Sequence, residues 1–251
     1  MSHERLALSS ADLEDLDVPA LDAFLVARAP GLLAATSRDE AATRLGLLGR
    51  SAPRTVPTLV GLYVFGRVPQ YLFPEWGVGC AAIEGRSLTD PIRKREDLEG
   101  PVVKLLDQAL AFVRAESGGG DEYPEGAVRE ALANALIHRD LRKASRVAVR
   151  VFSDRLEIWS PGGPPEGYTD LDDLAREGGI SAPRNPLLAS VARQLGVGEQ
   201  IGRGLVVTRA SLPANRRGEV DAKVELRSTP RDVLVVIPSS WQRPRDAQEL
   251  S

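Results

Sequence analysis

The sequence predicts an α+β protein in which helices cover one face of a mixed, mainly antiparallel sheet, with a smaller N-terminal α/β segment ahead of it. Strand-like runs, in which every second residue is apolar, occur in adjacent pairs in the second half of the chain. Helical patterns lie apart from these pairs instead of following each strand, which favours α+β over a parallel α/β sheet. With 251 residues, 43% apolar and 27% charged, the chain can build one large core or two modest ones.

The strands of the second half are predicted as two hairpins. In the first, Arg146–Phe152 and Arg155–Trp159 alternate apolar and polar residues and are joined by a tight turn at Ser153-Asp154. The second joins Ala222–Arg227 to Asp232–Ile237. Helical patterns between the hairpins cover Asp170–Arg176, Pro186–Leu195 and Gly204–Leu212.

The first half of the chain carries helical patterns over Pro19–Ala29, Arg38–Leu47 and Pro101–Glu116. Ser37 precedes the second helix and Glu40 follows three residues later, which is the pattern of a capping box. The run Pro57–Gly66 is apolar on all sides, so periodicity leaves it open between a buried helix and a strand. Val78–Glu84 is predicted to be a strand.

A glycine-rich joint, residues 117–120 (SGGG), follows the last of these helices. We therefore predict a disordered or loosely attached N-terminus over residues 1–18 and a connecting domain of helices and strands over residues 19–116. The joint covers residues 117–122. The main domain follows over residues 123–238, and residues 239–251 form a polar tail.

Composition argues against several classes of protein. No run approaches the roughly 18 apolar residues of a membrane span, and the first residues lack the apolar core of a secretory signal, so we expect a cytoplasmic protein without membrane contact. One cysteine and two histidines cannot build a cysteine/histidine zinc cluster. Residues 1–120 carry 13 basic and 16 acidic side chains and residues 121–251 carry 19 of each, which predicts no direct nucleic-acid patch.

The helix predicted from about Pro124 to His138 carries the chemistry. Glu130, Asn134 and His138 lie at i, i+4 and i+8, in one polar stripe beside an apolar stripe of alanines. A carboxylate and an amide oxygen one turn apart suit a magnesium–phosphate site, because Mg²⁺ takes oxygen ligands and usually only one or two from protein. Glu130 is also a candidate general base. The alternative is that Glu130 is solvated, that Asn134 bonds the neighbouring turn, and that His138 is structural.

Two glycine clusters lie where strands and helices meet. Gly162-Gly163 follows the second strand of the first hairpin, and Gly202-Arg203-Gly204 precedes a helix. Glycines at such junctions let backbone amides approach a phosphate, and a helix N-terminus adds favourable partial charge. Ordinary loop and helix-entry glycines explain both clusters equally well.

The order of these motifs resembles a known family. Residues 129–140 (REALANALIHRD), 154–163 (DRLEIWSPGG), 181–186 (SAPRNP) and 202–204 (GRG) are similar to the divergent ATPase-type C-terminal module of bacterial helicase-like proteins and transcriptional regulators, often found behind a Schlafen-type DNA-binding domain. The resemblance extends upstream through Pro57–Gly66 and covers roughly residues 20–238. The wider kinship is with the gyrase, heat-shock chaperone, histidine kinase and mismatch-repair ATPases, whose Bergerat fold matches the predicted fold class.

The resemblance implies roles for individual residues. Glu130 corresponds to the water-activating carboxylate and Asn134 to the magnesium ligand. Gly162 and Gly163 correspond to the first glycine box under the adenine, Gly202 and Gly204 to the second box at the phosphates, and residues 164–201 to a lid. The cofactor-binding residues expected for ATP and Mg²⁺ are Asn134, His138, Ser160, Gly162, Gly163, Arg184, Gly202, Arg203 and Gly204.

Two departures from the family pattern matter. Ser160 stands where the superfamily has an aspartate that accepts the adenine amino group, and a neutral hydroxyl is a weaker acceptor than a carboxylate. In addition, nothing basic or strand-rich before Pro19 fits the Schlafen-type domain.

Two functional hypotheses follow. In the first, ATP and Mg²⁺ operate a nucleotide-dependent switch in which hydrolysis is slow or absent, so the protein is at most a weak ATPase. In the second, a non-catalytic transcriptional regulator or scaffold keeps the fold for dimerisation or partner binding without nucleotide. The resemblance implies a homodimer, and a protein partner or a regulated DNA-binding protein is expected with either hypothesis.

Overall fold

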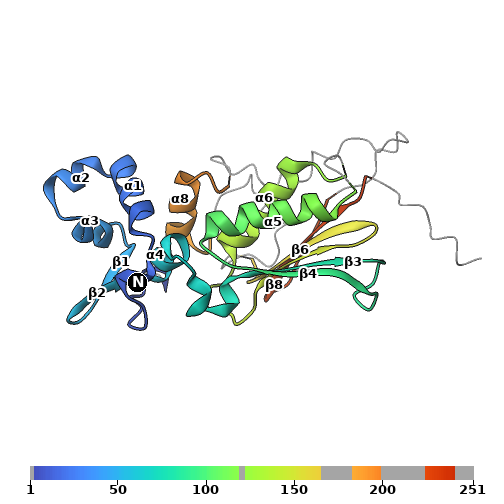
Figure 1. Ribbon diagram of the computed structural model, residues 1–251, viewed down its shortest axis with the longest axis horizontal. Helices are drawn as coiled ribbons and strands as arrows, with labels where there is room; N and C mark the ends of the chain where they lie inside the picture. Colours follow the sequence, from blue (N-terminus) through green and yellow to red (C-terminus); the bar gives the residue numbers. More distant parts are fainter. Residues whose placement is uncertain (1–2, 119–121, 165–182, 199–223, 241–251) are drawn as a thin grey trace, which may run out of the picture.

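The computed structural model describes residues 3–118, 122–164, 183–198 and 224–240 (Figure 1). The predicted α+β class is confirmed: a six-stranded mixed sheet in the order β4-β3-β5-β6-β8-β7 lies beneath helices, and a separate two-stranded sheet lies near the N-terminus. Among the described strands, β3 and β5 pair in parallel and all other neighbours are antiparallel.

The N-terminal elements alternate short helices with one hairpin. They are the 3-10 helices η1 (His3–Arg5) and η2 (Leu13–Asp15), then α1 (Val18–Arg28), α2 (Pro30–Ala35), α3 (Arg38–Arg44), β1 (Leu48–Ser51), β2 (Arg54–Pro57), α4 (Leu59–Phe65), η3 (Pro69–Tyr71) and η4 (Pro74–Trp76). The ambiguous apolar run is the helix α4, which is buried along its whole length and begins after Thr58, whose hydroxyl accepts from the Gly61 amide. Only glycine fits at Gly61, because a Cβ there would lie 1.8 Å from the carbonyl oxygen of Leu47.

The six-stranded sheet joins both halves of the sequence. Its strands are β3 (Val78–Ile83), β4 (Ile92–Leu98), β5 (Val147–Val151), β6 (Arg155–Pro161), β7 (Glu225–Ser228) and β8 (Asp232–Pro238). Sequence reasoning did not identify β4, because its run IRKREDL has no apolar alternation. It is an edge strand, and basic side chains such as those of Arg93, Lys94 and Arg95 discourage pairing with another chain.

Helices α5 (Val102–Glu116) and α6 (Glu125–His138) pack on the sheet, and α8 (Pro186–Gln194) packs against α6 and α4. Figure 1 shows α5 and α6 side by side above the strands, with α8 between them and the N-terminal helices. Alternate residues of β5 and β6, including Val149, Val151 and Ile158, are buried beneath them. This layer fixes α6 against β6, where the predicted site residues lie.

The joint between the predicted domains is tied to the end of the sheet. Glu122 is fully buried, its carboxylate accepts a 2.6 Å hydrogen bond from Ser239 Oγ, and its carbonyl oxygen accepts one from Ser240 Oγ. Strands β3 and β4 precede the joint but belong to the same sheet as β5 to β8. The sheet therefore spans the predicted boundary at residues 117–122. The predicted helices at 170–176 and 204–212 lie outside the described residues.

Candidate functional site

The centre of α6 presents the predicted carboxylate and amide together. Asn134 Nδ2 donates a 2.9 Å hydrogen bond to Glu130 Oε1, so the two side chains lie on one face of the helix, one turn apart. Glu130 is 8% exposed and Asn134 is partly buried. Because the amide nitrogen faces Glu130, the atom that would bind a cation, Asn134 Oδ1, is not the atom bonded to the carboxylate. The pair therefore combines a buried carboxylate with an amide oxygen suited to Mg²⁺.

Ser160, near the end of β6, is bonded to the same helix. Its hydroxyl donates a 2.9 Å hydrogen bond to the carbonyl oxygen of Ala135, and the residue is 5% exposed. This bond places the end of β6 directly beside the residue that follows Asn134. Since the hydroxyl hydrogen points to Ala135, Ser160 Oγ can offer only lone pairs to a further group.

The glycine turn after β6 is packed against the chain itself. Gly162 has φ +115°, and its amide donates to the carbonyl oxygen of Arg231 over 2.8 Å. A Cβ on Gly163 would lie 2.5 Å from the Thr229 carbonyl oxygen and 2.6 Å from Pro230. Both glycines are therefore required by local backbone geometry, whether or not a ligand also lies against them.

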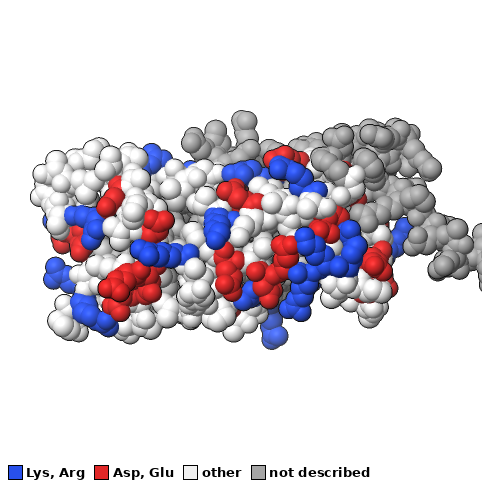
Figure 2. All heavy atoms as spheres, in the orientation of Figure 1, with Lys and Arg blue, Asp and Glu red and all other residues white. Residues whose placement is uncertain are grey.

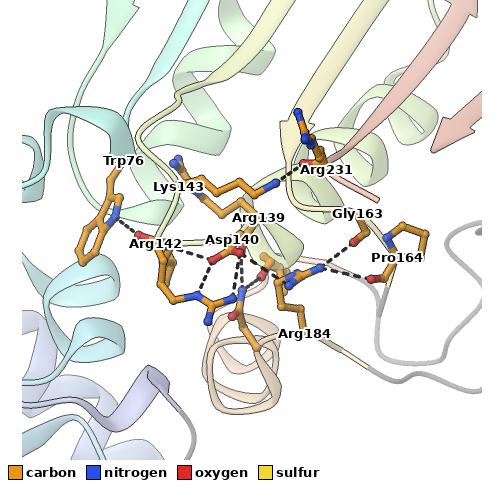
Figure 3. Close-up of polar contacts among 12 residues, drawn as sticks. Trp76, Arg139, Asp140, Arg142, Lys143, Gly163, Pro164, Arg184 and Arg231 are labelled. Atoms are coloured by element: carbon orange, nitrogen blue, oxygen red, sulfur yellow. Dashed lines mark hydrogen bonds and ion pairs between the residues drawn. The ribbon is translucent and has the colours of Figure 1, made fainter. Parts of the chain in front are cut away.

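A clasp, which we define as Asp140, Arg142 and Arg184, holds this turn (Figure 3). Arg184 Nη2 donates to the carbonyl oxygens of Gly163 and Pro164 at 2.9 and 3.2 Å, while Nη1 lies 3.8 Å from Asp140 Oδ2. Arg142 donates two hydrogen bonds, of 2.9 and 3.0 Å, to the same carboxylate. This fork geometry is the strong form of an arginine–carboxylate pair.

Asn185 closes the C-terminal end of α6. Its Nδ2 donates 2.8 Å hydrogen bonds to the carbonyl oxygens of Ile137 and Arg139, and the residue is completely buried. The last carbonyls of a helix have no partner within the helix, so an amide from another segment satisfies them. Sequence reasoning assigned no role to Asn185, although an asparagine directly before a proline that starts a helix is a recognisable capping position.

Arg139, the residue that follows α6, is a fully buried cation. Its Nη2 donates to the carbonyl oxygens of Glu75 and Ser145 at 2.8 and 2.9 Å. Among the described residues, its Nε and Nη1 have no hydrogen-bond partner. The negative end of the α6 dipole favours a cation at this position, which offsets part of the cost of burial. Arg139 thus joins the N-terminal elements to the end of α6.

His138, which lies near the clasp, and Asp140, which belongs to it, have shifted pKa values. Burial lowers the pKa of His138 from 6.5 to about 4, and the positive charge of Arg184 acts in the same direction. Burial alone would raise the pKa of Asp140, but the hydrogen bonds and charge of Arg142, with the charge of Arg184, outweigh it and lower the pKa to about 2. At neutral pH the site therefore holds a neutral imidazole and an ionised carboxylate.

The structure brings the predicted residues together in two groups. Glu130 and Asn134 form one pair on α6. His138, Ser160, Gly162, Gly163 and Arg184 gather around the C-terminal end of that helix, together with Asp140 and Asn185, for which the sequence alone predicted no separate role. Gly202, Arg203 and Gly204 lie outside the described residues.

Surface charge on the face drawn in Figure 2 is mixed. Lysine and arginine side chains alternate with aspartate and glutamate over the described part of that face, without a large area of one sign. Several charged side chains of the described residues are paired, as in Arg146 with Asp97 and Arg114 with Glu125. In the described part of the chain, no helix has both the length and the apolar character required to cross a bilayer.

Comparisons with known proteins find a match for the part of the chain that runs from just before β5 into β8. Residues 144–236 match the sequence model of the family described as "Putative ATP-dependent DNA helicase recG C-terminal". No curated protein matches the chain. The fold is similar to the crystal structure of the DIP2311 protein from Corynebacterium diphtheriae, with a TM-score of 0.66 and 23% identity over 95% of this chain. This chain spans 40% of that protein's length, and at this identity the likeness concerns the fold alone. Residues 144–236 are therefore similar in sequence to a divergent ATPase-like module.

Proposed function

We propose that the protein is a nucleotide-dependent switch that binds ATP and Mg²⁺ beside α6 and hydrolyses ATP slowly or not at all. The observation that carries the proposal is the Glu130–Asn134 pair, a nearly buried carboxylate bonded to an amide one turn away. The pair lies on the helix that packs against β6, a strand inside the stretch that matches an ATPase-like family model. The family match begins at residue 144, after the end of α6. The support that α6 gives to the proposal therefore comes from its geometry and not from the match.

Each residue of the pair has a distinct role in this proposal. Asn134 Oδ1 would be the protein's ligand to Mg²⁺, and the phosphates and water would complete the coordination. Glu130 would take a proton from the attacking water. A carboxylate that already accepts a hydrogen bond from Asn134 is a weaker base than a free one, which is why we expect slow turnover.

Ser160 would contact the base. Because its hydroxyl hydrogen is donated to Ala135, Ser160 Oγ can accept a hydrogen bond from an amino group such as that of adenine. The missing aspartate would then weaken this contact, since a charge-assisted bond is roughly twice as strong as a neutral one. We also propose that the protein acts in the cytoplasm as a homodimer or with a regulated protein partner.

The glycine turn supports a second function. Gly162 and Gly163 are packed against Asp140, Arg184 and the turn at Thr229-Pro230, so their presence has a structural explanation that needs no ligand. In this alternative the chain is a non-catalytic transcriptional regulator or scaffold that keeps the fold to bind a partner. The two functions differ in what Asn134 does, because a scaffold does not require its amide oxygen.

Calorimetric titration with Mg²⁺ and a non-hydrolysable ATP analogue separates the two functions. We expect measurable heat for the wild-type protein and at least tenfold weaker binding for Asn134→Ala. Equal heats for both proteins, or no heat for either, would remove the switch. Gly202→Val tests the second glycine box in the same assay and should also weaken binding.

Phosphate release tests Glu130. We expect Glu130→Gln to lower any ATP turnover while binding persists. Glu125→Gln is the matched control, because Glu125 lies on the same helix and its side chain is 65% exposed. Unchanged release in Glu130→Gln would take away its assigned role as general base.

A further inference from the structure

The N-terminus of α8 is capped from the far end of the chain. Glu4, in η1, is fully buried, and its two carboxylate oxygens accept from the amides of Leu188 and Leu187 at 2.8 and 3.2 Å. These amides belong to the second and third residues of α8, which follow Pro186, and they are the groups that a capping side chain normally satisfies. The cap therefore comes from 183 and 184 positions away in the sequence.

Asn185 occupies the capping position of α8 and does not cap it. Its side chain makes no hydrogen bond to the helix that follows; instead its amide nitrogen is bonded to the end of α6. Its Oδ1, the atom that would accept from an α8 amide, is buried and has no hydrogen-bond partner in the described part of the chain. The amides it would bond are those held by Glu4.

We propose that Glu4 is a positioning residue that keeps Asn185 on α6 by occupying the N-terminus of α8. Asn185 can serve either of two helices: its own, through Oδ1, or α6, through Nδ2. An asparagine at this position readily accepts from the second or third amide of its own helix. While Glu4 holds those amides, Asn185 is available to α6.

The consequence for the candidate site follows from where α6 ends. Asn185 bonds the carbonyl oxygens of Ile137 and Arg139, one turn beyond Asn134, and the neighbouring Arg184 holds the glycine turn. Helix α8 packs against both α4 and α6, so a change at its N-terminus reaches both halves of the molecule (Figure 1). An effect on nucleotide affinity rests on the proposed function, whereas the exchange of caps does not.

Nuclear magnetic resonance of the full-length protein tests the exchange of caps. In Glu4→Ala, and in the larger Glu4→Met, which also lacks an acceptor oxygen, if alanine unfolds the protein, we expect the Asn185 side-chain amide resonances to shift as Nδ2 leaves α6. The Leu188 backbone amide should stay protected from hydrogen exchange, because Asn185 Oδ1 replaces Glu4. In the double variant Glu4→Ala/Asn185→Ala, that amide should exchange at least tenfold faster than in Glu4→Ala.

A matched control is Asp17→Ala, which removes an exposed cap from α1, where Asp17 Oδ1 accepts from the Ala20 amide. It should leave the Asn185 resonances in place. An unshifted Asn185 amide in both Glu4 variants, or equal exchange of Leu188 in the single and double variants, would overturn the proposal.

A binding measurement then separates this proposal from the proposed function. We expect Glu4→Ala to bind Mg²⁺ and the ATP analogue about tenfold more weakly than wild type. If the wild-type protein binds no analogue, the proposed function fails and the resonance and exchange data still decide the role of Glu4. If wild type binds and Glu4→Ala binds equally well, Glu4 does not position the site.

Discussion

Asparagine side chains make different contacts at the middle of α6 and at its C-terminal end. In the middle of the helix, Asn134 is partly exposed and bonded to a carboxylate of the same helix. At the C-terminal end, the fully buried Asn185 and the adjacent Arg184, whose side chain is 21% exposed, donate hydrogen bonds to backbone carbonyls. The motifs that resemble the ATPase family therefore include both a pair of side chains suited to a ligand and a set of side chains that hold the backbone in place. The resemblance alone does not distinguish these two roles, whereas the contacts in the structure do.

The comparison also explains why a restored aspartate at Ser160 should not improve the site. Ser160→Asp would place a carboxylate against the carbonyl oxygen of Ala135 in a position that is 5% exposed. We expect a loss of about 3–5 kcal/mol in the free energy of unfolding, because a buried charge would face an acceptor. Chemical denaturation measures it. Ser160→Ala, which removes one hydrogen bond, should cost about 1 kcal/mol. A stable Ser160→Asp protein with tighter nucleotide binding would contradict this account.

The two asparagines provide a direct contrast in stability. Asn185→Ala removes two hydrogen bonds to buried carbonyls and should lower the free energy of unfolding by about 2–4 kcal/mol. Asn134→Ala removes one bond from a partly exposed side chain and should cost less than about 1 kcal/mol. Denaturant titration of both variants measures the difference. Equal losses would mean that the contacts at the middle and at the C-terminal end of α6 do not differ in this way.

His138, at the C-terminal end of α6, makes the free energy of unfolding depend on pH in the acid range. Its folded pKa of about 4 is below the unfolded value of 6.5, so the unfolded state binds more protons and stability falls as pH drops through this window. We expect a loss of about 1–2 kcal/mol at pH 5 relative to pH 7.5 from this group. His138→Gln should flatten that part of the stability curve. Below pH 4, protonation of Asp140, whose pKa is about 2, adds a further loss as the clasp opens.

Local patterns in the sequence predicted much of the fold. The period of Val147, Val149 and Val151 identified β5, and the helical spacing of apolar residues identified α1, α5 and α6. Strand β4 was not predicted, since its partner β3 stabilises it and its own polar sequence gives no signal. The ambiguous run at residues 57–66 is a helix because tertiary packing buries every side of it.

The relative placement of Glu130 and Asn134 was predictable from the sequence, whereas the hydrogen-bond partners of the surrounding residues were not. The spacing of Glu130 and Asn134 placed them on one helical face, as observed. The bond from Ser160 to Ala135 and those from Asn185 to α6 join residues 25 to 48 positions apart, and local periodicity carries no information about them. The cap from Glu4 is more distant still and depends on the whole N-terminal segment being folded.

The side-chain amides of Asn134 and Asn185 permit the most direct test of whether the middle of α6 binds a ligand while its C-terminal end only holds the backbone. The chain has only three asparagines, so each side-chain resonance can be assigned by substitution. Their resonances should be followed while Mg²⁺ and a non-hydrolysable ATP analogue are added to the wild-type protein. The account predicts that the Asn134 amide shifts and the Asn185 amide stays in place. A shift at Asn185 with none at Asn134, or no shift at either, would contradict it.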